Sequence, residues 1–275
     1  MSSTRAQPIG SKFLSKGRIL IGMVHVGATP GTPFASAGVD QLAAQAAEEA
    51  RLLREAGFDA IIVENMHDAP YVHGEALGPE QTATMTRVAL AVAGEFKGPM
   101  GVQILSGGNT QALAVASATG AGFIRCENFV FSHVADEGVL ERAEAGPLLR
   151  YRRHIGAEHI AIAADIKKKH ASHAITADVS IGETAEAAQF FGVDALIVTG
   201  PSTGKPADLD DLKHVRRVAT VPVLVGSGVT PESVAPLFNF AEALIVGSSI
   251  KEQGSWKNPV DPARAEAIVQ ARDRA

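Results

Sequence analysis

The chain has 275 residues, a formal net charge of −5 and a single cysteine, Cys126. The acidic balance gives no basis for a general affinity for nucleic acid or acidic membranes, and one cysteine excludes an internal disulfide framework and fits a reducing compartment. Apolar residues make up 46% and charged residues 20%, as in a globular protein with ample material for a core. Residues 1–13 lack the apolar centre of a signal peptide and no apolar run approaches a membrane span, so we expect a soluble, cytoplasmic protein.

Short strand-like runs alternate along the chain with longer segments of helical character. The eight runs are Arg18–Val26, Ala60–Met66, Met100–Ser106, Phe123–Phe129, Ile160–Lys167, Ala195–Gly200, Val221–Gly228 and Ala243–Ile250. Strands that are apolar on both faces and joined through helices indicate a parallel sheet. Eight such units predict one closed (β/α)8 TIM barrel over residues 18–275, after an N-terminal extension of residues 1–17. A doubly wound sheet is the structural alternative.

Several local signals mark helix starts. Ser180 and Glu183 have the spacing of a capping box, and Thr230-Pro231 and Asp261-Pro262 each place a cap before a proline at the first helical position. The basic segment Leu148–Gly156 is interpreted as a solvated helix face, and not as a nucleic-acid patch, because the chain is acidic overall.

Loop lengths predict which face of the barrel carries the function. The connections from helix to strand are short, as at Gly57, before Phe123 and at Gly192. The connections from strand to helix are long in two places, Asn65–Pro79 and Phe129–Gly146. We therefore expect the site at the carboxyl ends of the strands, where barrels of this kind place their active sites.

The last two strands end in glycine and serine. Barrels often form a phosphate site here from backbone N–H groups and a helix amino terminus, because glycine lets the backbone approach an anion. The predicted phosphate-binding residues are Gly226, Ser227, Gly228, Gly247, Ser248 and Ser249. The alternative is that these glycines only make tight strand-to-helix turns.

The segment Thr199–Leu209 resembles a nucleotide-binding P-loop but lacks its first glycine, and Pro206 follows Lys205 where Ser or Thr is required. We interpret it as a flexible loop in which Lys205 either reaches an anionic substrate or is simply solvated.

Polar side chains on the strands are expected to point into the barrel mouth, because a charge facing the surrounding helices would be buried without water. We predict that Asp165 and Lys167 share one face of their strand, as do Arg125 and Glu127. A carboxylate or histidine here could move protons or bind a divalent metal, and a lysine could pair with a carboxylate, stabilise an oxyanion or form a Schiff base. The alternative is a set of structural ion pairs. The candidate catalytic residues are His25, Glu64, Arg125, Glu127, Asp165 and Lys167.

Further substrate contacts are predicted at the same mouth. The candidates are Asn65, Gln103, Lys169, His170, Thr199, Thr203 and Lys205. No metal signature of recognised spacing occurs and no cofactor is evident. The long second loop holds His67, Asp68 and His73, which could form a lid, bind a metal or be ordinary surface groups.

Seven segments of the chain resemble the BtpA family. They are IGMVHVGATPGTP, DAIIVENMHDAPY, GPEQTATMTRV, LLRYRRHIGAEHIAIAADIKKKH, DALIVTGPSTGKPADLDDLKHVR, VPVLVGSGVTPESV and NPVDPAR, in family order from about Ile19 to Asp273. The resemblance implies a (β/α)8 fold related to phosphate-binding barrels, without fixing a reaction. It covers His25, Pro30, Gly31, Pro33, Glu64, Asn65, Asp68, Arg125, Asp165, Lys169, His170, Thr203, Gly204, Lys205 and Gly226–Gly228. The chain departs from the family pattern at Gln103, Ser106 and Glu127, which indicates a shifted specificity.

These observations favour an enzyme that acts on a small phosphorylated substrate, a sugar phosphate or a nucleoside derivative. Acid/base chemistry of an isomerase, a lyase or a glycosidic hydrolase would fit the candidate residues. The alternative, implied by the resemblance, is a non-catalytic biogenesis or assembly factor of the photosystem I type. We expect a homo-oligomer that uses the side of the barrel.

Overall fold

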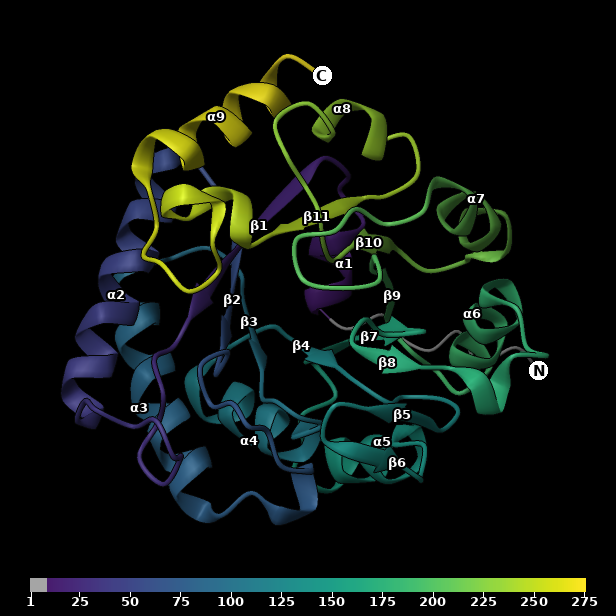
Figure 1. The fold of residues 1–275 in the computed structure, drawn as a ribbon, viewed down its shortest axis with the longest axis horizontal. Helices are drawn as coiled ribbons and strands as arrows, with labels where there is room; N and C mark the ends of the chain where they lie inside the picture. Colours follow the sequence, from purple (N-terminus) through teal and green to yellow (C-terminus); the bar gives the residue numbers. More distant parts are fainter. Residues whose placement is uncertain (1–8) are drawn as a thin grey trace.

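The computed structural model describes residues 9–275, which contain a closed barrel of eight parallel strands (Figure 1). The strands are β1 (Ile19–His25), β2 (Ala60–Glu64), β3 (Met100–Gln103), β4 (Phe123–Cys126), β7 (Ala161–Ile166), β9 (Ala195–Val198), β10 (Val223–Val225) and β11 (Ala243–Val246). Each pairs with the next in this order, and β11 pairs with β1 to close the ring. The predicted barrel is confirmed, and the doubly wound alternative is wrong.

Helices surround the strands on the outside (Figure 1). They are α2 (Val39–Ala56), α3 (Pro79–Glu95), α4 (Asn109–Thr119), α5 (Ala145–His154), α6 (Ile181–Phe190), α7 (Leu209–Val218), α8 (Val234–Leu237) and α9 (Pro262–Asp273). The Ser180 capping box of α6 is present, and the Asp261 carboxylate accepts the backbone N–H groups that begin α9. The predicted start at Thr230 is wrong, because residues 231–233 form a turn and α8 begins at Val234.

The barrel interior is narrow because small residues alternate with branched ones. Ala161, Ala163 and Ala195 face inward beside Ile21, Ile62, Ile197 and Leu224. One large ring, Phe123, fills the lower centre, and a Cβ added at Gly101 would lie 2.3 Å from it. The interior is therefore packed, and only the upper ends of the strands are left for polar groups.

The amino-terminal ends of the strands are covered by α1 (Ile9–Leu14), which is seen through the centre of the ring in Figure 1. Leu14 is fully buried against the first residues of several strands, including Ile19, Ala161 and Ala243. The described part of the predicted extension thus closes this end of the barrel, and its residues 1–8 lie outside the described residues.

The long loops at the opposite end carry structure that the sequence did not predict. Three short strands, β5 (His133–Ala135), β6 (Gly138–Leu140) and β8 (Ala171–Ser172), form a separate antiparallel sheet in the order β6-β5-β8. Single turns occur at η1 (Gly74–Ala76), η2 (Ala174–Thr176), η3 (Ser248–Ile250) and η4 (Glu252–Gly254). The sheet joins the loops after β4 and β7 into one structure beside the mouth.

The basic segment of α5 is only partly the solvated face that we predicted. Arg152 is buried, its Nη1 donates to the Asp194 carboxylate at 2.5 Å, and the same carboxylate accepts the backbone N–H of Ile162. Arg152 therefore attaches α5 to the barrel wall. Arg150 and Arg153 are exposed as expected. No helix within residues 9–275 has the length and apolarity needed to cross a bilayer.

Candidate functional site

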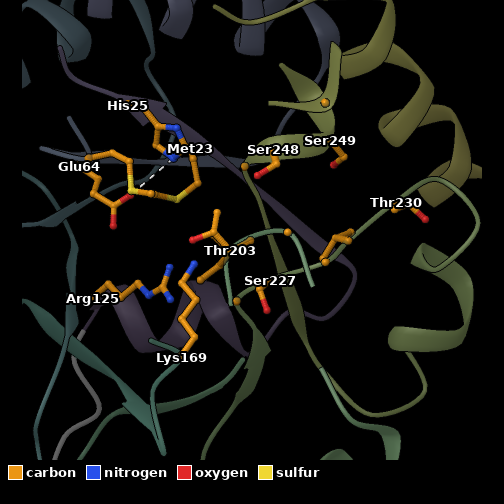
Figure 2. A pocket seen from close by; sticks show the side chains of 18 of the residues that line it. Met23, His25, Glu64, Arg125, Lys169, Thr203, Ser227, Thr230, Ser248 and Ser249 are labelled. Atoms are coloured by element: carbon orange, nitrogen blue, oxygen red, sulfur yellow. Dashed lines mark ion pairs between the residues drawn. The ribbon is translucent and has the colours of Figure 1, made fainter. Parts of the chain in front are cut away.

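A cavity of about 260 Å³ opens at the carboxyl ends of the strands, as the loop lengths predicted (Figure 2). Its lining comes from β1, β2, β4 and the loops after β7, β9, β10 and β11, with one cation from α9. The polar side chains that line it are His25, Glu64, Arg125, Lys169, Thr203, Ser227, Thr230, Ser248, Ser249 and Arg264. We call it the phosphate cavity, because the residues that the sequence predicted to bind phosphate line it.

All six predicted phosphate-binding residues line this cavity. They differ in what their hydroxyls can offer. The Ser227 hydroxyl is already used, since it accepts the Gly200 backbone N–H at 2.7 Å and donates to the Lys205 carbonyl at 2.9 Å. The Ser249 hydroxyl oxygen is buried and has no hydrogen-bond partner among residues 9–275. Ser249 and Ser248 are therefore the serines whose hydroxyls remain available to a bound anion.

Only glycine fits at position 228, because the loop after β9 comes very close to the backbone there. Its φ is +68°, and a Cβ there would lie 2.3 Å from the Pro206 Cα. The contact brings residues 203–206 over the end of β10. Lys205 contributes only backbone to this packing and does not line the cavity, contrary to its predicted contact with an anion.

His25 and Glu64 form a buried pair at the end of β1 and β2, with Nε2 and Oε2 3.5 Å apart (Figure 2). Nδ1 lies 3.1 Å from the Trp256 carbonyl oxygen, which can only accept a hydrogen bond, so Nδ1 carries the proton. Burial, reinforced by the nearby Lys251 cation, lowers the pKa of His25 well below its usual value. His25 is therefore neutral, and its Nε2 presents a lone pair to Glu64.

Because of its surroundings, Glu64 holds its proton more strongly than an ordinary carboxyl does. Burial raises the pKa of Glu64, and the cations Arg125 and Lys169 oppose the shift without cancelling it. A proton on Oε2 would point to the His25 lone pair. The pair thus places a carboxyl with a raised pKa beside an imidazole with a lowered pKa in a buried setting, an arrangement that can carry out general acid/base chemistry.

Arg125 and Lys169 point into the cavity from β4 and the loop after β7 (Figure 2). Arg125 is fixed by Asp165, which accepts two hydrogen bonds at 2.8 and 3.0 Å. Burial lowers the pKa of Lys169, and the neighbouring Arg125 lowers it further. Two cations therefore converge beside the His25–Glu64 pair, and Asp165 acts as the partner of Arg125 and not as a free acid or base.

A second cavity of about 390 Å³ continues from the first. Both are lined by Glu64, Met66, Arg125, Lys169 and Thr203. We call this second space the annex. It is lined by four of the predicted residues, Gln103, Glu127, Asp165 and His170, which therefore lie next to the phosphate cavity. We call the two cavities together the basin. The His170 ring accepts the backbone N–H of Thr203 at 3.0 Å, which ties two predicted substrate contacts together.

An ion network lies on one wall of the annex. The Lys168 amine donates to Glu127 at 3.1 Å and to Glu137 at 3.3 Å, and the Ser106 hydroxyl also bonds to Glu137. Although burial lowers the pKa of Lys168, the two carboxylates raise it overall. Glu137 comes from the β5–β6 turn, so the network connects the small sheet to the barrel.

Besides Lys205, three predicted site residues lie outside both cavities. The shared face of Asp165 and Lys167 is wrong, because β7 ends at Ile166 and Lys167 has a φ of +48°, which breaks the strand alternation. Its amine approaches the Thr176 carbonyl at 3.4 Å, outside both cavities. Asn65 is buried and bonds to Asp68 and to the Leu105 backbone, and Thr199 accepts the Lys169 backbone N–H. Asn65 and Thr199 support the loops and do not line either cavity.

Several residues of the basin were not among the predicted site residues. They are Tyr71, Glu137, Lys168, Trp256 and Arg264. Arg264 had a signal, since it lies in the NPVDPAR segment. Glu137 and Trp256 had none, because they reach the mouth through irregular loops.

Two of the candidate residues of the second loop, Asp68 and His73, make hydrogen bonds to neighbouring segments. Asp68 is buried and accepts hydrogen bonds from Thr29 and Asn65, and the His73 Nε2 lies 3.0 Å from the Glu137 carbonyl. Within residues 9–275, no three His, Cys, Asp or Glu side chains are grouped to hold a metal ion.

Comparisons with known proteins agree with this architecture. The model of the BtpA family matches residues 16–274. The chain is 45% identical over 266 residues to the uncharacterized protein F13E9.13, mitochondrial, of Caenorhabditis elegans, covering 94% of this chain and 95% of that one. It is 32% identical over 253 residues to the photosystem I biogenesis protein BtpA of Synechocystis, covering 92% and 87%. Thiamine phosphate pyrophosphorylase of Pyrococcus furiosus shares the fold, with a TM-score of 0.58 at 14% identity over 96% of this chain and 98% of that one.

Proposed function

The chain belongs to the BtpA family, and from that premise and the geometry of the basin we propose that it is an enzyme acting on a small phosphorylated substrate. The observation that carries the proposal is the placement of an acid/base pair beside an anion seat. His25 and Glu64 line the phosphate cavity together with the glycine segments after β10 and β11, and Gly247 lies directly beside the His25 ring (Figure 2).

We call the segments Gly226–Gly228 and Gly247–Ser249 the anion seat, and they have the features that a phosphate group needs. Glycines let the backbone approach the anion, and the Ser249 hydroxyl lacks another partner among the described residues. Arg264 reaches the cavity from α9, and Lys169 and Arg125 lie across from it. Three cations, of which Arg125 is also paired with Asp165, face one carboxyl whose pKa is raised, Glu64, and this balance makes the cavity favourable for a phosphate dianion.

The chemistry proposed for the pair is proton transfer. Neutral His25 accepts a proton at Nε2, and the Trp256 carbonyl stabilises the imidazolium that forms by accepting from Nδ1. Glu64, which faces Nε2 at 3.5 Å, is the group that exchanges this proton with Nε2 and passes it to or takes it from the substrate. Arg125 and Lys169 face the same space and would stabilise negative charge that develops on a substrate oxygen. This set suits an isomerase or a lyase, and also the protonation of a leaving group in glycosidic hydrolysis.

Two further observations bear on the proposal. The fold is shared with an enzyme whose name includes a phosphorylated compound, which agrees with a phosphate seat at this position. A relative at 32% identity is named as a photosystem I biogenesis protein, which favours a second candidate, a non-catalytic assembly factor. Under that candidate the basin would have no small-molecule ligand.

The test is direct binding of inorganic phosphate and ribose 5-phosphate by calorimetry. The wild type should bind both, and Ser248→Asp, which places a carboxylate in the seat, should weaken both about a hundredfold or more. Ser117→Asp on the exposed face of α4 is the matched control and should bind as the wild type does. Absence of binding to the wild type by any phosphorylated compound would exclude the enzyme proposed here and favour the assembly factor.

A further inference from the structure

The annex is lined by a side chain with a buried polar atom that has no hydrogen-bond partner in the described part of the chain. Gln103 is the last residue of β3, is 2% exposed and lines the annex beside Glu64. Its Oε1 has no hydrogen-bond partner among residues 9–275. A buried amide oxygen without a partner is costly, and native proteins rarely keep one unless a ligand or water completes it. Its position indicates a ligand that donates a hydrogen bond at this depth.

The residues that line the annex determine which kind of ligand fits into it. Tyr71, Leu105, Ala69 and the Trp256 ring contribute apolar surface, and the Tyr71 hydroxyl is occupied by its bond to the Met66 carbonyl at 2.7 Å. The space of about 390 Å³ is the size of ordinary small-molecule sites. It therefore accepts a partly apolar group larger than a phosphate.

The charges of the annex select against a second anion. Two of its cations are already engaged, Arg125 by Asp165 and Lys168 by both Glu127 and Glu137. Asp136 at the tip of the β5–β6 turn adds a further carboxylate. Five carboxyls against three cations line this space, whereas cations predominate in the phosphate cavity. A second phosphate or carboxylate group would be repelled there.

Resting on the proposed function, we propose that one ligand spans both cavities. It is a phosphate monoester whose far end is uncharged, partly apolar and bears a hydroxyl or amino group that donates to Gln103. The residues shared by the two cavities place its middle atoms beside Glu64, Arg125 and Lys169, and His25 pairs with Glu64 from the phosphate cavity. Phosphorylated sugars and nucleoside monophosphates both meet this description, and bisphosphates do not.

The experiment compares four probes on the same protein by calorimetry. These are inorganic phosphate, ribose 5-phosphate, adenosine 5′-monophosphate and fructose 1,6-bisphosphate. At least one of the two monoesters should bind about tenfold or more tightly than inorganic phosphate, and the bisphosphate should gain nothing over it. A gain for ribose 5-phosphate would identify the far end of the ligand as a sugar, and a gain for adenosine 5′-monophosphate would identify it as a nucleoside.

Variants separate the annex from the seat. Gln103→Met keeps the chain length and should remove most of the monoester gain, about tenfold, while inorganic phosphate binds unchanged. Its melting midpoint should not fall, because the lost amide oxygen had no partner. Gln45→Leu on the exposed face of α2 is the control. Asp136→Asn, at an exposed turn, should strengthen fructose 1,6-bisphosphate binding and leave inorganic phosphate unchanged.

The results distinguish the two proposals. If inorganic phosphate binds but neither monoester binds more tightly, or if Gln103→Met keeps the full gain, the spanning ligand is wrong and the phosphate seat stands. Preference for the bisphosphate, or no response of its binding to Asp136→Asn, would equally overturn the charge selection. If none of the four probes binds, the proposed function itself fails, and the inference with it.

Discussion

Arg125 and Asp165, on the adjacent strands β4 and β7, are joined by two hydrogen bonds of 2.8 and 3.0 Å in the barrel mouth. Their side chains are 4% and 2% exposed. A buried, two-point ion pair fixes the direction of the guanidinium, whose remaining N–H groups face the two cavities. The two residues therefore differ in their roles: Arg125 faces the two cavities, and Asp165 positions it.

Breaking this pair should destabilise the protein. Asp165→Asn leaves a buried guanidinium without its counter-ion, so the free energy of unfolding should fall by about 3–5 kcal/mol in urea denaturation. The double variant Arg125→Met with Asp165→Leu should recover much of that loss, because both charges are gone. Glu95→Gln, which removes the partner of Arg54 in an exposed pair, should change stability far less. An Asp165→Asn protein as stable as the wild type would contradict the role of the pair.

Gly228 offers a test of the loop contact that shapes the seat. Gly228→Ala meets both a φ of +68° and the Pro206 backbone at 2.3 Å, whereas Gly156→Ala meets a φ of +69° with open space around it. Gly156→Ala should cost about 1–2 kcal/mol, the penalty for the left-handed conformation alone. Gly228→Ala should cost clearly more and weaken phosphate binding. Equal losses of stability in thermal or urea unfolding would show that the crowding is absent.

The raised pKa of Glu64 has a consequence for stability against pH. A group whose folded-state pKa is raised contributes stability that is present below its unfolded pKa and is lost as the pH rises through the folded pKa. The wild type should therefore lose stability relative to Glu64→Gln as the pH rises above 4.5, by at most about 1.4 kcal/mol per pH unit. Urea unfolding from pH 4 to pH 8 measures the difference. A flat difference between the wild type and Glu64→Gln would refute the shift.

The tautomer of His25 can be observed directly. Burial and the Lys251 cation lower its pKa, and the Trp256 carbonyl accepts from Nδ1, so the ring should be neutral with the proton on Nδ1 at pH 7. Nitrogen-15 shifts of the labelled ring should report that tautomer and remain constant from pH 8 down to pH 6. Assignment of the signal by comparison with His25→Gln completes the measurement. A ring that titrates near pH 6.5 would remove His25 as a neutral proton acceptor.

Periodicity determined the barrel and the end of it that carries polar groups. Each predicted run contains an observed strand, and His25, Glu64, Gln103, Arg125 and Asp165 all lie on strands where inward direction follows from alternation. Gly226–Gly228 and Gly247–Ser249 follow the last two strands and line the phosphate cavity as expected. The spacing of residues along each strand is enough to predict these positions, because the strands of a closed barrel bring their ends together.

Only the tertiary structure decided which groups pair with one another and which line the two cavities. Lys167 turns away because a positive φ ends the alternation one residue after β7, and Lys168 is held by Glu137 from a turn 31 residues earlier. Asn65 bonds to Asp68 in the same loop, and the Trp256 carbonyl reaches His25 across 231 residues. Contacts of this kind depend on how irregular loops pack against one another, and packing between distant segments leaves no periodic signal in the sequence.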